Sequence, residues 1–375
     1  MVRLAMMIAR PAIDGSMMHE LPRQKPGSSR RLPAAVIGVV FAGAGVACLV
    51  SILSADPSGT TGRPAQSQQA TSEAPALAAV FKPFQDQLAI KWDERFLYVG
   101  SSGIPDHPMM IGITAWQQQV PLPQSYVGDN AWRIPLHPVK AGVPLSAKTH
   151  FFRGAIAIAA NGVPIFNPIK NDGHTDTFLA GELDDHGGHS GRADDYHYHI
   201  APLFLEKAVG PGHPIAVALD GYPIYGSTEP DGTPLDLKTL DQFNGHVDAK
   251  GNYHYHGTKA YPYVNGGFHG EVTDRGGQVD PQPHADPVRD AGAPLRGAKI
   301  TAFTSTQPQH YTLTYEADEE VRKINYWIDD AGVYHFEYVD GQGNKTVKIY
   351  HHHSHDGPAD HHHDPQGNDT PPPPR

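Results

Sequence analysis

Six histidines recur at fixed spacings in the middle of the chain, and their imidazole side chains are of the type that ligates transition metals. The tetrapeptide Tyr-His-Tyr-His occurs at residues 196–199 and again at residues 253–256. Each copy is preceded, at the same distance, by an aspartate and by a Gly-His pair that contributes His189 or His246. Because side chains alternate along a strand, both histidines of a tetrapeptide lie on one face and both tyrosines on the other. A third histidine that folds back over the histidine face completes a set of three imidazoles.

Such a set suits Zn²⁺ or Cu²⁺ and leaves one coordination position for water or a substrate. Thiolate ligation is excluded in this part of the chain, since the only cysteine is Cys48. We therefore predict that copper or zinc is bound by two sets of histidines: His189, His197 and His199, and His246, His254 and His256. Asp184 and Asp241 are predicted to contact the rings and fix their tautomers. The sequence leaves open whether the two sets form one shared site or two.

Three functions agree with these residues. The first is binding of a divalent transition metal for handling or delivery. The second is a metalloenzyme that hydrolyses or oxidises a substrate at the open position, with Asp194 or Asp195 as the general base. The third is a non-catalytic structural or adhesion module in which the Tyr-His hairpins are architecture. Metal binding is favoured because the structural explanation must hold at all six histidines. Further polar residues lie near the two copies: His174 and His186 near the first, Asp220 and His269 near the second.

The histidine sets belong to a longer internal repeat. Residues 156–166 match residues 215–225 at an offset of 59, whereas the histidines match at an offset of 57, so one two-residue deletion aligns the whole unit. Each of the two apolar runs ends in Asn-Gly or Asp-Gly. This pattern predicts a buried strand that enters a tight turn, where glycine supplies a positive φ.

Short apolar runs broken by Gly and Pro predict strands elsewhere in the chain, at residues 96–99, 109–113 and 132–136. Alternation of apolar and polar residues predicts a three-strand meander at residues 323–328, 333–339 and 346–350. Helices are expected to be few and short, because no long pattern of period 3.6 occurs downstream of residue 53. The predicted fold is mainly β: a duplicated strand-turn-hairpin unit forming one β-rich domain, plus a small C-terminal β meander.

Composition limits the classes of partner. A net charge of −11 argues against a nucleic-acid binder, because contacts to phosphates require a basic face. Residues 34–53 are twenty uncharged, mostly apolar residues that follow a basic stretch, which predicts a transmembrane anchor or a signal segment with the N-terminus in the cytoplasm. The body is then exported, either tethered to the cell membrane on its periplasmic or extracellular side or secreted after cleavage. A buried core helix is a weaker explanation, since it leaves the charge asymmetry unexplained.

We predict the following division of the chain: a cytoplasmic basic region at 1–33, the anchor or signal segment at 34–53, a flexible linker at 54–79, the domain with the internal repeat at 80–275, a second linker at 276–300, the meander at 301–350 and a His-rich disordered tail at 351–375. The histidine runs of the tail suit loose metal binding or a solubilising role. Protein partners are not indicated.

The chain resembles the YHYH-domain family, which is named for the repeated tetrapeptide. The supporting residues are the two tetrapeptides, Asp-Gly-Tyr-Pro-Ile-Tyr-Gly at 220–226, Asn-Gly-His at 244–246, Tyr-Pro-Tyr at 261–263 and Gly-Gly-Phe-His-Gly at 266–270, so the resemblance spans roughly residues 151–271. It implies an exported or surface-associated protein and supplies no activity or fold. In this family a cysteine often occupies the positions of Phe243 and Gly267. The chain departs at both together, as expected for loss of a paired disulfide, so any role of those cysteines does not carry over.

Overall fold

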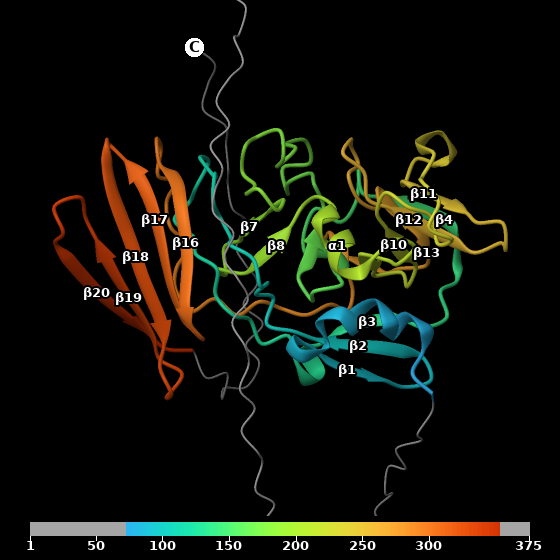
Figure 1. Ribbon diagram of the computed structural model, residues 1–375, viewed down its shortest axis with the longest axis horizontal. Helices are drawn as coiled ribbons and strands as arrows, with labels where there is room; N and C mark the ends of the chain where they lie inside the picture. Colours follow the sequence, from blue (N-terminus) through green and yellow to red (C-terminus); the bar gives the residue numbers. More distant parts are fainter. Residues whose placement is uncertain (1–72, 353–375) are drawn as a thin grey trace, which may run out of the picture. The chain divides into compact units, whose positions relative to one another are not determined.

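The computed structural model describes residues 73–352 (Figure 1). With 35% strand and 9% helix it is mainly β, as the sequence predicts. Within the described residues, no helix is long and apolar enough to cross a membrane. The predicted segments at 1–33 and 34–53, and most of the 54–79 linker and of the 351–375 tail, lie outside the described residues.

The histidine hairpins belong to an eight-stranded sheet with the strand order β7-β8-β6-β5-β9-β10-β12-β11. Its strands are β5 (Ala155–Ala159), β6 (Pro164–Phe166), β7 (Gly188–Ser190), β8 (Tyr196–Tyr198), β9 (Ala216–Ala218), β10 (Pro223–Tyr225), β11 (Gly245–Val247) and β12 (Tyr253–His256). The two halves use the same pairings: β6–β8 and β10–β12 are parallel, and β7–β8 and β11–β12 are antiparallel. Descent of the halves from one duplicated unit stays a prediction.

The two central strands, β5 and β9, are the apolar runs of the repeat. They pair antiparallel, and all their residues are buried. Burial on both faces explains why they read as continuous apolar segments rather than alternating ones. The predicted turns after them are confirmed, with φ of 79° at Gly162 and 94° at Gly221. β5 and β9 thus form the centre of the sheet, and one histidine hairpin lies at each edge.

The other elements before the meander are short. Three antiparallel strands, β1 (Ala89–Trp92), β2 (Phe96–Gly100) and β3 (Trp132–Pro135), form one sheet, and β4 (Lys140–Ser146) pairs with β13 (Gly267–Gly270), as β14 (Asp274–Arg275) does with β15 (Gln278–Val279). The helices are η1 (Ala76–Gln87), η2 (Gly128–Asn130), η3 (Leu203–Leu205), α1 (Glu206–Val209) and η4 (Leu237–Thr239). As expected, none forms a long helix.

The strand predicted at residues 109–113 is wrong, because this buried segment is a turn. Met110 has a φ of 68°, and its N–H donates to Oδ2 of Asp184 at 2.8 Å. Its apolar residues therefore reflect burial against distant parts of the chain, which an apolar run cannot distinguish from a strand.

The C-terminal meander has five antiparallel strands instead of the three predicted (orange to red in Figure 1). They are β16 (Lys299–Gln307), β17 (His310–Ala317), β18 (Glu320–Ile328), β19 (Tyr334–Val339) and β20 (Lys345–Tyr350). Only part of each missed strand is buried, with Ile300 and Phe303 in β16 and Tyr311 and Leu313 in β17. Polar residues are so frequent in β16 and β17 that no clear alternation of apolar and polar residues is visible in their sequence.

Candidate metal centres

The first histidine hairpin, β7–β8, is organised by Asp184. Its Oδ1 accepts hydrogen bonds from the N–H of His186 (2.9 Å) and of Gly188 (3.1 Å), which closes the turn before β7. Its Oδ2 accepts a hydrogen bond from the hydroxyl of Tyr196 (2.7 Å). The carboxylate thereby joins the start of the hairpin to the tetrapeptide in β8.

Asp241 organises the second hairpin in the same way. It accepts hydrogen bonds from the N–H of Phe243 (2.8 Å) and Gly245 (3.1 Å) and from the hydroxyl of Tyr253 (2.8 Å). A β-carbon at Gly245, or at Gly188 in the first hairpin, would overlap the tyrosine hydroxyl, which explains the glycine before each histidine. The structure thus corrects the predicted role of the two aspartates: they bind tyrosines and backbone and position the hairpins, and they do not fix the rings.

The first set of histidines converges on one point. Nε2 of His199 lies 3.2 Å from Nε2 of His197 and 3.1 Å from Nε2 of His189. His197 and His199 are 4% and 6% exposed, and the ring of Phe166 stacks on His197 with centroids 3.9 Å apart. Among the described residues, these three histidines form a group that could hold a metal ion.

The second set converges likewise and includes a carboxylate. Nε2 of His246 lies 3.0 Å from Nε2 of His254 and 3.3 Å from Nε2 of His256. Oε2 of Glu229 lies 3.2 Å from Nε2 of both His246 and His254, and 3.6 Å from Nε2 of His256. Four ligand atoms therefore surround one position. The structure places the two sets in different halves of the sheet, each as its own group, and metal binding by these residues stays a prediction.

Backbone carbonyl groups set the tautomer of three rings. Nδ1 donates to a carbonyl oxygen in the pairs His197–Asp195 (2.9 Å), His199–Asn167 (2.6 Å) and His256–Gly226 (2.9 Å). Since a carbonyl only accepts, Nδ1 carries the proton and Nε2 of the neutral ring presents a lone pair. The role that sequence reasoning gave to carboxylates therefore belongs to the backbone of the strands and turns beside the sheet.

Burial keeps several of these rings neutral. It holds the pKa of His189 and His199 well below the usual value, and the charges of neighbouring rings add to this effect. Burial also lowers the pKa of His256 to about 4. For His254, burial lowers the pKa although its hydrogen bond to Glu229 acts in the opposite direction. At neutral pH these nitrogens are free of protons and able to bind a cation.

Glu229 was missed by sequence reasoning. It lies in the turn after β10, and the first copy of the repeat has no acidic residue at the matching position. The repeat therefore does not mark Glu229 as a possible ligand. The turn packs against β11 and β12, and this tertiary contact places the Glu229 carboxylate beside the three histidines as a fourth possible ligand.

Asp194 does not fit the role of general base. Its carboxylate receives two hydrogen bonds from Arg289, Nε–Oδ2 at 2.6 Å and Nη2–Oδ1 at 2.7 Å, and another from the N–H of Val120 at 2.9 Å. Asp195 lies closer to the first set, with Oδ2 at 3.3 Å from Nδ1 of His197, on the side of the ring that faces away from the other histidines. A base for the enzyme hypothesis is therefore not found in Asp194.

The other polar residues near the two copies lie outside the sets. His174 is exposed, His186 stacks on His107 with centroids 3.8 Å apart, and His269 stacks on Tyr253 with centroids 3.7 Å apart. These stacks support the tyrosine side of the hairpins.

Asp220 is buried next to the tyrosine side of the second hairpin, and burial raises its pKa to about 6. Oδ2 accepts hydrogen bonds from the hydroxyl of Tyr255 (2.6 Å) and the N–H of Gly270 (2.9 Å). The folded carboxyl keeps its proton up to about pH 6, whereas the unfolded one, with its ordinary pKa of 3.8, releases it earlier. Asp220 should therefore contribute a decrease in the free energy of unfolding as the pH rises from about 4 to about 6, by about 1.4 kcal/mol per pH unit, whereas the histidines with lowered pKa contribute an increase.

Asp220→Asn should remove this decrease, and the matched position of the first half already carries Asn161, which donates to the hydroxyl of Tyr198 at 3.0 Å. Urea unfolding at pH 4 to 7 in the presence of a chelator measures the difference between the two proteins. Asn161→Asp is the reciprocal control and should introduce a decrease. A difference between wild type and Asp220→Asn that does not change with pH contradicts the prediction.

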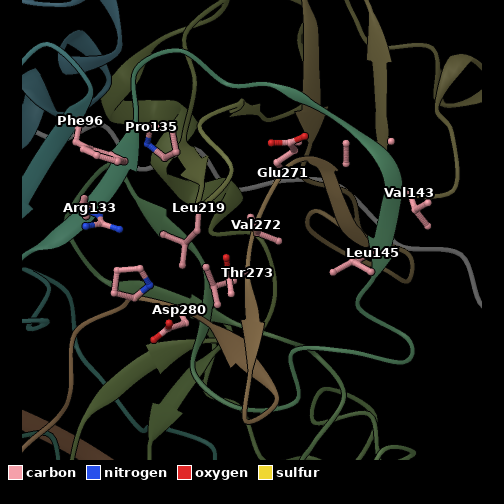
Figure 2. Close-up of a pocket in the computed structure, with 15 residues that line it drawn as sticks. Phe96, Arg133, Pro135, Val143, Leu145, Leu219, Glu271, Val272, Thr273 and Asp280 are labelled. Carbon is pink, nitrogen blue, oxygen red and sulfur yellow. The ribbon is translucent and has the colours of Figure 1, made fainter.

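Each set borders a cavity. A cavity of about 310 Å³ is lined by all three histidines of the first set, and one of about 360 Å³ is lined by Glu229 and His246 of the second. Figure 2 shows another cavity, of about 520 Å³, with Arg133, Glu271 and Asp280 in its lining and no histidine. The guanidinium of Arg133 lies 4.5 Å from the ring centroid of Phe96, so this cation is already partnered. None of the predicted metal ligands lines the cavity of Figure 2.

Comparison with protein families bears out the resemblance stated from the sequence. Residues 131–238 match the family model described as YHYH protein, a stretch that contains the first tetrapeptide and ends before the second. Comparison with curated proteins gave no match, and comparison with solved structures gave none.

Phe243 and Gly267, for which the resemblance implies a cysteine pair in the family, lie side by side. A β-carbon at Gly267 would be 2.7 Å from Cε1 of Phe243, and the N–H of the preceding Gly266 donates to the carbonyl oxygen of Phe243 at 3.0 Å. The Phe243 ring fills the space above a glycine that has no side chain. Phe243 and Gly267 are therefore neighbours in the fold, and a disulfide between these positions in relatives stays an implication of the resemblance.

Proposed function

We propose that this chain, which carries a YHYH domain at residues 131–238, binds two divalent transition-metal ions, one at each set of histidines. The observation that carries the proposal is the approach of His197 and His199, whose Nε2 atoms lie 3.2 Å apart while both Nδ1 atoms donate to carbonyl oxygens. When two neutral rings carry their protons on Nδ1, the lone pairs of their Nε2 atoms face each other and no hydrogen bond can form between them. A cation between them converts this repulsion into two bonds.

The separations between ligand atoms support the proposal. In a tetrahedral zinc site with bonds of about 2.0–2.1 Å, neighbouring ligand atoms are about 3.3–3.4 Å apart. Five of the six distances within the second set run from 3.0 Å between His246 and His254 to 3.6 Å between His256 and Glu229. Three imidazoles and a carboxylate in this arrangement favour zinc, since Cu²⁺ prefers a tetragonal geometry. For the first set, copper and zinc remain equal candidates.

The first set also supports a second candidate function, a metalloenzyme. Its group of possible ligands among residues 73–352 is the three histidines alone, and a cavity adjoins them. Three imidazoles with a fourth position for water or substrate are the ligand set of catalytic zinc. A metal bound there would supply Lewis acidity to a ligand at that position.

Elemental analysis of the purified chain tests metal binding. The protein should carry no affinity tag, and the tail histidines at 353, 355 and 361–363 should be changed to serine, because such runs bind ions without a fold. We refer to this protein as the tail-substituted chain. After loading with zinc and dialysis, two zinc ions per chain are expected. His197→Ala/His199→Ala and His254→Ala/His256→Ala should each retain one.

The matched control is His174→Ala/His213→Ala, which removes two exposed histidines and should keep both ions. Circular dichroism of each variant separates loss of ligands from loss of fold. Absence of bound metal in the folded tail-substituted chain contradicts the proposal and leaves the hairpins as part of a structural module.

We also propose that the chain is exported and tethered to the membrane by residues 34–53, or secreted if this segment is cleaved. The uncharged segment and the basic residues before it support this proposal. Cell fractionation tests it, and recovery of the whole chain from the cytosol contradicts it.

A further inference from the structure

Lys170 and Glu229 occupy matching positions in the two halves of the eight-stranded sheet. The offset of 59 residues that aligns β6 with β10 also aligns residues 170–173, Lys-Asn-Asp-Gly, with residues 229–232, Glu-Pro-Asp-Gly. In each turn the glycine N–H donates to the carbonyl oxygen of the first residue, at 2.9 Å in the first half and 2.8 Å in the second. The backbone therefore brings both side chains out at the same place relative to the histidines.

In the second half this place holds a ligand atom. Oε2 of Glu229 completes the group formed by His246, His254 and His256, and the group has four ligand atoms. A metal bound by all four has a filled tetrahedral shell, as in structural zinc sites.

In the first half the same place holds a cation. Nζ of Lys170 pairs with Oε1 of Glu182 at 2.8 Å and cannot ligate a metal while protonated. Lys170 lines the same cavity as His189, His197 and His199, so the ammonium lies beside the set. The exchange of carboxylate for ammonium leaves the fourth position of the first set without a protein ligand and with a positive charge beside it.

The cavities repeat this difference in charge. The cavity at the first set is lined by three cationic side chains and one acidic one: Arg153, Lys170, Arg192 and Glu182. The cavity at the second set is lined by three acidic side chains and one cationic one: Glu229, Asp231, Asp248 and Lys250. A negatively charged molecule is thus attracted to the first set and repelled from the second.

We propose that the first set is a receptor for a small anion, which binds its metal at the open position through an oxygen atom and is held by the charge of Lys170. Carboxylates and phosphates share this chemistry, and a volume of about 310 Å³ restricts the ligand to a small molecule. The inference rests on the proposed function, since the anion binds to the metal. The second set, closed by Glu229, takes no such ligand.

Cobalt(II) and azide provide the test in the tail-substituted chain. Cobalt(II) takes the same ligands, and its visible absorption changes when an anion enters the coordination shell. Two cobalt ions and one azide per chain are expected, with acetate and phosphate displacing azide, and the more effective competitor identifies the better ligand class. Lys170→Glu should keep both cobalt ions and weaken azide binding by about tenfold or more, because it places a carboxylate at the open position.

Lys250→Glu is the matched control, since it makes the same change in net charge on an exposed lysine beside the second set. It should leave azide binding unchanged. Glu182→Gln frees Lys170 from its ion pair and should not weaken azide binding. A chain that binds no cobalt overturns both the proposed function and this inference. A chain with two cobalt ions that binds no azide, or in which Lys170→Glu behaves like Lys250→Glu, overturns this inference alone.

Discussion

Arg289→Ala should lower the free energy of unfolding by about 3–5 kcal/mol, because it leaves the carboxylate of Asp194 buried without a counter-charge. The two side chains are 8% and 4% exposed and form a bidentate pair. Nη2 of Arg289 also donates to the carbonyl oxygen of Gln118 at 2.8 Å, and the guanidinium lies 4.9 Å from the ring centroid of Phe336 in β19. One side chain therefore ties the loop before β8 to the C-terminal meander. Urea denaturation measures the loss.

Arg322→Ala is the matched control, since Arg322 pairs with Glu320 and Asp318, whose side chains are 33% and 77% exposed. This change should cost about 1 kcal/mol or less, as exposed ion pairs do. The double variant Arg289→Met/Asp194→Asn removes both buried charges and should recover much of the stability. Equal losses for Arg289→Ala and Arg322→Ala would show that the buried pair has no special role.

Saturating zinc should raise the melting temperature of the tail-substituted chain by about 8–16 °C for each site. Binding to the folded state at a free concentration of 1,000 times Kd stabilises it by about 4 kcal/mol, and each kcal/mol shifts the melting temperature of a domain this large by about 2–4 °C. The same ion relieves the contact between Nε2 of His197 and Nε2 of His199. Differential scanning calorimetry with zinc and with a chelator measures the shift.

Each double-alanine variant should lose the contribution of its own site and keep the other. A variant that lacks both sets should melt at the same temperature with zinc and with chelator. A shift that persists in this variant would mean that zinc stabilises the fold at other residues, which contradicts the assignment of the sites.

Several features of the fold and site follow from local sequence patterns. The apolar runs that form β5 and β9 predict buried strands, and the Asn-Gly and Asp-Gly pairs after them predict turns. Both predictions depend only on residues that are adjacent in sequence. The identical spacing of the two tetrapeptides and their Gly-His pairs predicts the same two groups of three histidines that lie together in the structure. Alternation along β8 and β12 separates histidines from tyrosines whatever surrounds the strands.

Other features depend on residues that are distant in sequence, so only the tertiary structure decides them. Glu229 contacts the second set from the turn after β10, and Lys170, in the matching turn, lines the same cavity as the first set. Asp194 is a candidate general base by sequence alone, whereas in the fold Arg289, 95 residues away, donates to its carboxylate. Local sequence patterns predicted that the chain is mainly β and that the six histidines lie in two groups. The tertiary structure decided which charge stands beside each set, because charge at a site is the sum over all chain segments that fold onto it.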